Sequence, residues 1–383
     1  MTSHFEELEG ALASGGEGAV LDELIEQLRS SKQYHELFEA LKMRARRQIN
    51  LPLLYSDNGD ELDESLREGL ENGLFEACRE VGQLLLSDGK VREGWMYLRP
   101  VGDREMAAQL IGAIEANDDN LDELVEVCLH EGVDAERGFR LVLDSFGTCN
   151  AITTFESLVH QRPKEELLAA AKLLVKHVHD ELSATLRADI AQQEGEELAD
   201  APIADLVADR DWMFGEHSYH IDTTHLASTI RYARLLEDKQ LLRLALDMTE
   251  YGRRLHQQFQ YEGDEPFTDL YPSHALFFQA LLGENVEPAL EFFLDKAKTI
   301  DAYEFGAGSV ETYIDLLARV GRVDDAIQAL VELTPDNAHL TGQAPSLLEL
   351  SQRAGDYSQF IAHCRAKNDL LGFATGLLSA GSN

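Results

Sequence analysis

Cysteine is scarce in this chain: only four are present among 383 residues, and none belongs to a CxxC pair. This scatter disfavours a disulfide framework or a zinc knuckle and fits buried free thiols in a reducing compartment. The sequence also lacks any run of about 20 apolar residues, and its beginning, MTSHFEELEG, has no basic segment followed by an apolar one. We therefore expect a cytoplasmic protein with no membrane partner.

Basic residues are few compared with acidic ones. The chain has 33 Lys and Arg against 70 Asp and Glu, which gives a net charge of −37 spread along its length. Such a surface repels phosphate backbones, so nucleic acid is not expected as a partner. The acids are explained most simply as a solvated face that keeps the protein in solution. Apolar residues make up 44% of the chain, which is enough to form a hydrophobic core.

Common catalytic and cofactor motifs are absent as well. The sequence has no GxGxxG after a strand, no phosphate loop ending in GKS or GKT, no HExxH, no GxSxG and no kinase signature. The common cofactor classes are therefore unsupported, and the sequence leaves open whether the protein is an enzyme.

Helical periodicity is what the sequence has in abundance. From Pro163 to Ile190, apolar residues recur every three or four positions, which predicts one long amphipathic helix. Similar patterns predict further helices at 21–28, 34–43, 70–86, 104–114, 121–129, 227–236, 241–255, 274–282 and 310–320. Long alternations of β-branched and polar residues, which a sheet would need, are missing. The sequence predicts an all-α fold.

Some turns between the helices share a local pattern. A glycine ends one helix, a small residue follows five positions later, and an apolar residue comes four positions after that. The pattern occurs at Gly89, Gly94 and Leu98 and again at Gly321, Ala326 and Leu330. The small residue is expected to permit close contact between two helices.

The second instance lies in YIDLLARVGRVDDAIQALVELTPDN, which resembles the second half of a tetratricopeptide repeat. Gly321 and Gly355 are 34 residues apart, which is the period of that family. The resemblance is best over 310–383. The chain departs from the family pattern at Ile314 and Phe360, where a glycine and a small residue are expected, and Pro335 comes early.

The resemblance implies a right-handed superhelix of antiparallel helical hairpins with a concave binding face. Because the turns are irregularly spaced, we expect a degenerate tetratricopeptide-like α-solenoid, with closure into a toroid as the rival arrangement. We predict two helical arrays, 1–200 and 201–383, with an acidic connector between them. The second array carries two long insertions rich in aromatic residues, 210–225 and 257–273, and long ordered loops often carry function.

Histidine is concentrated in and beside these insertions. The candidate metal ligands are His217, His220, His225 and His274. If Asp222 or Thr223 caps the following helix, that helix and the loop before it would gather several imidazoles, which suit Zn, Fe or Mn. Their spacing matches no metal motif, so packing against neighbouring aromatic residues is the alternative.

A further set of residues is suited to an anionic ligand. If the two insertions meet, polar and aromatic side chains would converge on one pocket. The ligand-binding candidates are Tyr219, Asp222, Arg231, Arg253, Asp269 and Tyr271. Arg231 and Arg253 lie in a locally basic stretch, and guanidinium groups suit a carboxylate or a phosphate. Pairing of these arginines with neighbouring acids is the alternative.

Two functions from different classes follow. The first is a binding or scaffold protein whose concave face receives a peptide or a partner protein. The second is a metal-dependent enzyme or small-molecule binder that uses the histidine-rich site, with a divalent metal as cofactor and a small anionic substrate. The first predicts an open groove, and the second predicts that the insertions converge. The catalytic residues, the ligand and the oligomeric state are left open by the sequence.

Overall fold

The computed structural model describes residues 4–53, 62–159, 162–195, 199–335 and 340–381, and within these ranges the chain is helical. The only β pairing among them is an isolated bridge between Glu262 and Asp269. The predicted all-α class is confirmed. No helix in these ranges has both the length and the apolar character that crossing a bilayer requires.

The chain forms two compact units, Met1–Gly147 and Thr148–Asn383. The division falls inside helix α7 (Ala135–Leu158), where Gly147 interrupts the helical backbone with φ +81° and ψ +175°. A glycine tolerates this positive φ without the steric cost that a side chain would add. Each unit is described by itself below.

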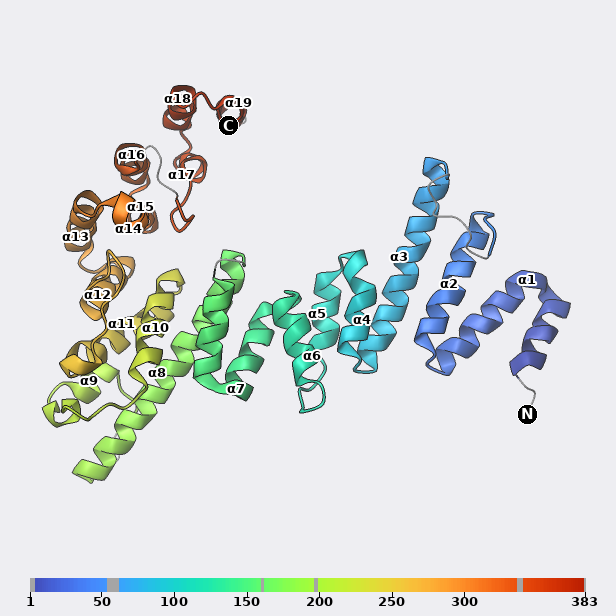
Figure 1. The fold of residues 1–383 in the computed structure, drawn as a ribbon, viewed down its shortest axis with the longest axis horizontal. Helices are drawn as coiled ribbons and strands as arrows, with labels where there is room; N and C mark the ends of the chain where they lie inside the picture. Colours follow the sequence, from blue (N-terminus) through green and yellow to red (C-terminus); the bar gives the residue numbers. More distant parts are fainter. Residues whose placement is uncertain (1–3, 54–61, 160–161, 196–198, 336–339, 382–383) are drawn as a thin grey trace. The chain divides into compact units, whose positions relative to one another are not determined.

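The first unit is a succession of helices in which neighbours in sequence pack against one another (Figure 1). Its elements before α7 are α1 (His4–Ser30), α2 (Tyr34–Gln48), α3 (Glu64–Ser87), α4 (Val91–Leu98), η1 (Arg99–Val101), α5 (Arg104–Gly112), α6 (Leu121–Val125) and η2 (Glu126–His130). One core cluster joins α1, α2 and α3 around Leu37, Val81 and Leu85, and another joins α4 to α6 around Leu98 and Ile111.

The second unit begins with the remainder of α7 and continues through helices that again pack mainly on their chain neighbours. They are α8 (Lys164–Glu194), α9 (Ile203–Val207), η3 (Asp211–Phe214), α10 (Thr223–Tyr232), η4 (Ala233–Leu235), α11 (Lys239–Arg254), η5 (Gln257–Phe259), α12 (Leu270–Leu281), α13 (Val286–Thr299), α14 (Ala302–Phe305), α15 (Gly308–Arg319), α16 (Val323–Leu333), α17 (Leu347–Ala354), α18 (Ser358–Ala366) and α19 (Leu370–Ala380).

The predicted division near residue 200 lies inside the second unit. The long helix α8 packs on α9, α10 and α11. Asp247 of α11 accepts hydrogen bonds from the backbone N–H of Ile203 (2.7 Å) and Ala204 (2.9 Å) at the start of α9, and it lies 3.0 Å from His179 of α8. Asp247 therefore joins α8 and α9, the helices on the two sides of the predicted connector. The sequence did not indicate this contact, because Asp247 is far from both helices along the chain.

The turn pattern noted in the sequence has the predicted geometry. Gly89 and Gly321 adopt positive φ angles of +80° and +84° at the ends of their helices. A Cβ atom on Gly94 would lie 2.7 Å from the side chain of Leu86 and 3.0 Å from the carbonyl oxygen of Gly82, so α3 and α4 approach more closely there than any side chain would allow. Ala326 is fully buried.

The cysteines are all free, as expected, but they are not all buried. Cys128 and Cys364 are buried, whereas Cys149 is exposed on α7. Burial raises the pKa of the Cys128 thiol to about 11, which keeps it protonated and unreactive at neutral pH.

Candidate functional site

The two insertions of the second unit meet. The hydroxyl groups of Thr223 and Tyr261 are 3.0 Å apart, and the rings of Tyr219 and Phe259 are in edge contact with centroids 5.2 Å apart. The condition that the second function set, that the two insertions converge, is therefore met. The candidate polar groups His220 and Asp222, however, have partners outside the facing insertion.

The four candidate histidines have separate surroundings. The imidazole of His220 lies 2.9 Å from Asp189 through Nε2 and 3.2 Å from the Tyr251 hydroxyl through Nδ1. His274 is buried, with Nδ1 2.6 Å from the carbonyl oxygen of Leu270. His217 is exposed, and the backbone N–H of His225 donates to the capping carboxylate of Asp222. Within the described ranges, no three His, Cys, Asp or Glu side chains gather in a way that could hold a metal ion.

Most of the other candidate residues either make contacts within the fold or are exposed to solvent. Asp222, one of the two capping residues considered, caps α10. It accepts from the hydroxyl (2.6 Å) and the N–H (2.8 Å) of Thr224, and these hydrogen bonds lower the pKa of its carboxyl group. Tyr219 is 56% exposed, and Arg253 is exposed with its guanidinium 3.2 Å from Glu250 on the same helix. The backbone of Asp269 forms the isolated bridge. Tyr271 is fully buried on α12, and burial raises the pKa of its phenol.

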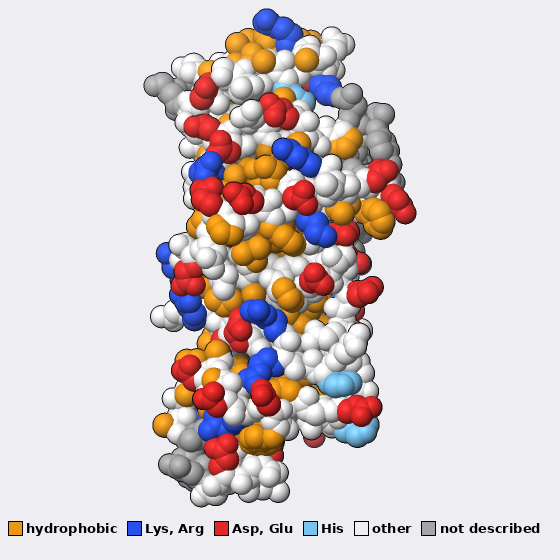
Figure 2. All heavy atoms as spheres, turned by 90° about the vertical axis from the view of Figure 1, so that its left-hand side faces the viewer, with side chains coloured by type: hydrophobic (Ala, Val, Ile, Leu, Met, Phe, Trp, Pro, Cys, Tyr) orange, Lys and Arg blue, Asp and Glu red, His pale blue; other side chains and the backbone are white. Residues whose placement is uncertain are grey.

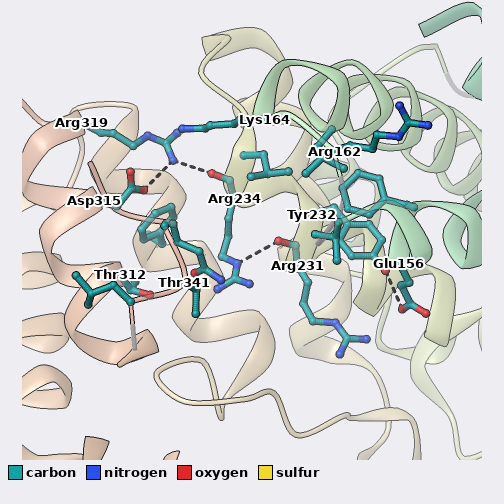
Figure 3. A pocket seen from close by; sticks show the side chains of 18 residues that line it. Glu156, Arg162, Lys164, Arg231, Tyr232, Arg234, Thr312, Asp315, Arg319 and Thr341 are labelled. Atoms are coloured by element: carbon teal, nitrogen blue, oxygen red, sulfur yellow. Dashed lines mark hydrogen bonds and ion pairs between the residues drawn. The ribbon is translucent and has the colours of Figure 1, made fainter. Parts of the chain in front are cut away.

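Arg231 is different, because it lines a cavity of about 760 Å³ in the second unit. The cavity is built from the end of α7, the start of α8, the α10–η4 turn, α12, α15 and the loop 340–343 (Figure 3). Its charged lining comprises the basic residues Arg162, Lys164, Arg231, Arg234 and Arg319 and the acidic residues Glu156 and Asp315. Five basic side chains against two acidic ones reverse the balance of the whole chain, in which acids are about twice as numerous as bases.

Arg231 and Arg234 are held close together by the helical turn that carries them. The Arg234 Nε–H donates to the carbonyl oxygen of Arg231 at 3.1 Å, and Arg231 Nη2 donates to the Ser228 hydroxyl at 3.2 Å. No carboxylate among the described residues lies within ion-pairing distance, 4.0 Å, of either guanidinium or of the Lys164 amine. Burial, and next the charge of Arg231, lower the pKa of Arg234 to about 10, so Arg234 is still protonated at neutral pH.

Arg319 has a different role in the wall. Its guanidinium pairs with Asp315 at 3.3 Å and donates to the carbonyl oxygens of Arg234, at 2.7 Å, and Leu236. The Arg319 and Asp315 side chains are largely buried, with 13% and 15% exposed. Burial raises the pKa of the Asp315 carboxyl, against the opposing effect of Arg319. Arg319 therefore connects α15 to the η4 turn and fixes the backbone from which Arg234 projects (Figure 3).

The Arg234 guanidinium rests on a stack of rings. It lies over the ring of Phe267 with 4.7 Å to the centroid, and Phe267 in turn stacks on His274 at 4.2 Å. Burial and the charges of Arg234 and Arg231 hold the pKa of His274 well below 6.5, so the imidazole is neutral. Since His274 Nδ1 faces a carbonyl oxygen, that nitrogen carries the proton. His274, which was predicted as a metal candidate, instead stacks on the Phe267 ring that contacts the Arg234 guanidinium.

The rest of the cavity wall is apolar or held by internal hydrogen bonds. The rings of Phe155 and Tyr232 stack with centroids 4.0 Å apart, and the Tyr232 hydroxyl donates to Glu156 at 2.8 Å. Glu311 on α15 is buried and accepts from Thr341 N–H (3.0 Å), Thr341 Oγ1 (2.8 Å) and Gly342 N–H (2.9 Å). Three hydrogen bonds to one buried carboxylate hold the loop 340–343 against the cavity.

Several arginines elsewhere on the surface of this unit have acidic partners. Arg243 pairs with Glu284 at 2.8 Å, and Arg322 pairs with Glu287 at 3.0 Å. Figure 2 shows a face of the molecule on which basic and acidic side chains are interspersed. The excess of basic side chains in the cavity lining contrasts with this mixed surface.

No family model matches this chain, and neither the curated proteins nor the solved structures include one that matches it.

Proposed function

We propose that the chain is a helical binding protein whose second unit takes an anionic ligand, through a carboxylate or phosphate group, in the cavity around Arg231 and Arg234. The observation that carries the proposal is a pair of arginines from one helical turn that both line the cavity and have no carboxylate within 4.0 Å of their guanidinium groups among the described residues, in a chain with 70 acidic residues.

The physical reason is the cost of an unpaired charge away from water. Taking an ion out of water costs several kcal/mol unless an opposite charge or strong hydrogen bonds replace the lost hydration. Burial lowers the pKa of Arg234, and the positive charge of Arg231 lowers it further, while the more distant carboxylates of Asp264 and Asp315 oppose both effects. A bound carboxylate or phosphate would offset both effects and could bridge the two arginines with bidentate hydrogen bonds.

The proposal also includes the tetratricopeptide-like superhelix. It is supported by the hairpin packing of α15 on α16 and of α17 on α18, and by the left-handed glycines Gly321 and Gly355 that follow the first helix of each pair. In this arrangement the anionic group belongs either to a small molecule or to an acidic side chain of a bound peptide. A metal-dependent reaction at the histidine-rich insertions stays a separate prediction, to which no contact among the described residues adds support.

Anion-dependent stabilisation tests the proposal. Because a ligand that binds only the folded protein stabilises it, inorganic phosphate should raise the Tm of the wild-type chain in a concentration-dependent way. The gain approaches about 2.7 kcal/mol when phosphate reaches about 100 times its Kd. Arg234→Met and Arg231→Met should each abolish most of the shift, measured by scanning fluorimetry at constant ionic strength.

Arg253→Met is the matched control. It removes the same charge from the same unit, at an exposed position paired with Glu250, where the pair contributes about 0 to 1 kcal/mol. This variant should keep the wild-type response to phosphate. A shift that is equal in all four proteins, or absent from wild type, would contradict the proposed function.

A further inference from the structure

The cavity is larger than an anionic group alone requires. Its volume of about 760 Å³ is in the range of pockets that hold whole small molecules, roughly 300 to 1,000 Å³. A phosphate or carboxylate at Arg231 and Arg234 would fill a small part of it. The remainder must be occupied either by water or by the body of the ligand.

Apolar side chains form much of the lining of that remainder. They are those of Phe155, Val159, Leu167, Leu235, Phe277 and Leu340, beside the polar residues Thr312, Thr341 and Gln343. Leu235 follows Arg234 directly in η4, so one helical turn presents both a cation and an apolar surface to the cavity. The guanidinium of Arg319 lies over the ring of Phe277, 5.7 Å from the ring centroid, and Phe277 is 2% exposed.

Leu340 gives an independent indication. Its side chain is 44% exposed, although it lines the cavity, and it directly precedes the two residues that Glu311 anchors. The three hydrogen bonds of Glu311 therefore hold the loop 340–343 in a position in which Leu340 is exposed to water. An apolar group bound in the cavity would cover the Leu340 side chain. Binding would be favoured because the apolar surfaces of both the ligand and Leu340 would leave water.

We infer that the ligand is an amphipathic anion: a molecule in which a phosphate or carboxylate is joined to an aromatic or aliphatic body. The inference depends on the proposed function for its charged end. The anionic group lies at Arg231 and Arg234, and the apolar body lies between the Phe155–Tyr232 stack and Leu340.

The test compares phenyl phosphate with inorganic phosphate by isothermal titration calorimetry of the full chain. Phenyl phosphate should bind at least about 10-fold more tightly, because its ring would be buried against the apolar wall. Leu340→Ser should weaken phenyl phosphate about 3-fold to 10-fold and leave inorganic phosphate unchanged. The exposed Leu371→Ser on α19 is the matched control and should change neither affinity.

The outcomes separate the two claims. Equal affinity for the two probes, or an equal effect of Leu340→Ser on both, would overturn the amphipathic ligand and leave the anion site standing. If neither probe binds to wild type, or if Arg234→Met binds phenyl phosphate as tightly as wild type does, the anion site itself fails and this inference fails with it.

Discussion

At the scale of single residues, the site depends on how Arg234 is supported. Its guanidinium lies on Phe267, which stacks on a neutral, buried His274. Nε2 of His274 has no hydrogen-bond partner among the described residues. A protonated His274 would place a third positive charge near Arg231 and Arg234, whose charges already lower its pKa. The packing of Arg234 on Phe267 and His274 is therefore most stable when the imidazole of His274 is neutral.

This support predicts a pH dependence of stability. The folded-state pKa of His274 lies below its unfolded value of about 6.5, so between the two values the unfolded chain binds more protons. The free energy of unfolding should therefore fall as the pH decreases below about 6.5 and lose about 1 kcal/mol from this group by about pH 5.5. Above about pH 7.5 this group contributes little slope, because the imidazole is then neutral in both the folded and the unfolded chain.

Urea unfolding at several pH values measures the effect. His274→Gln keeps a neutral donor for the Leu270 carbonyl and should show a shallower decline than wild type below about pH 6.5. His363→Gln, which removes a histidine from the half-buried surface of α18, should keep the wild-type slope. An unchanged slope in His274→Gln would mean that His274 does not titrate far below its ordinary pKa.

Several of these residues could be selected from the sequence and others could not. Asp222 was predictable because helix capping depends on a few consecutive residues. Arg231 and Arg253 looked equivalent as anion ligands, but α11 places Arg253 beside Glu250, one helical turn away. Lys164 and Arg319 reach the same cavity from helices about 150 residues apart in the chain, and no local pattern reports such a convergence.

At the scale of helices, close contact between α3 and α4 is the most testable feature. Gly82 and Gly94 face each other's helix, and a side chain on either would overlap the other's carbonyl oxygen and a leucine. Gly94→Val should therefore destabilise the first unit by about 1 to 3 kcal/mol through overpacking.

Tryptophan fluorescence can assign that effect to the correct unit. The chain has two tryptophans, Trp95 buried in the first unit and Trp212 43% exposed in the second, so Trp212→Phe leaves Trp95 as the reporter. In this background, Gly94→Val should lower the urea midpoint. Gly10→Val, at a position where an added Cβ atom would have nothing within 4 Å, should change the stability by less than about 0.5 kcal/mol. Equal effects of the two variants would show that α3 and α4 do not pack as closely as described.

The ranges predicted from local periodicity are mostly helical, but α7 and α13 lie in none of them, and the grouping of the helices was not predicted. The segment from Pro163 was predicted as one helix and is α8, Lys164–Glu194. The boundary between units escaped prediction because Gly147 lies within a stretch that is helical on both sides. The acidic connector looked like a linker by composition, yet Asp247 anchors the helix that follows it.

At the scale of the whole molecule, the net charge of −37 makes anion binding an unexpected property. Such a chain repels free anions over distances of about 10 Å at moderate salt, so its ordinary surface should not collect them. Anion binding must then come from a local arrangement that reverses the charge, as the cavity lining does. For the same reason, non-specific binding should contribute little to the experiments proposed above.

Arginine footprinting tests this central claim most directly, because every arginine of the chain is compared in one experiment. The protein is treated with phenylglyoxal, which modifies accessible guanidinium groups, with and without inorganic phosphate, and modified peptides are quantified by mass spectrometry. We predict that phosphate slows modification of Arg231 and Arg234 several-fold and leaves the exposed Arg253 and Arg243 unchanged. Uniform protection of all arginines, or none at Arg231 and Arg234, would contradict the account.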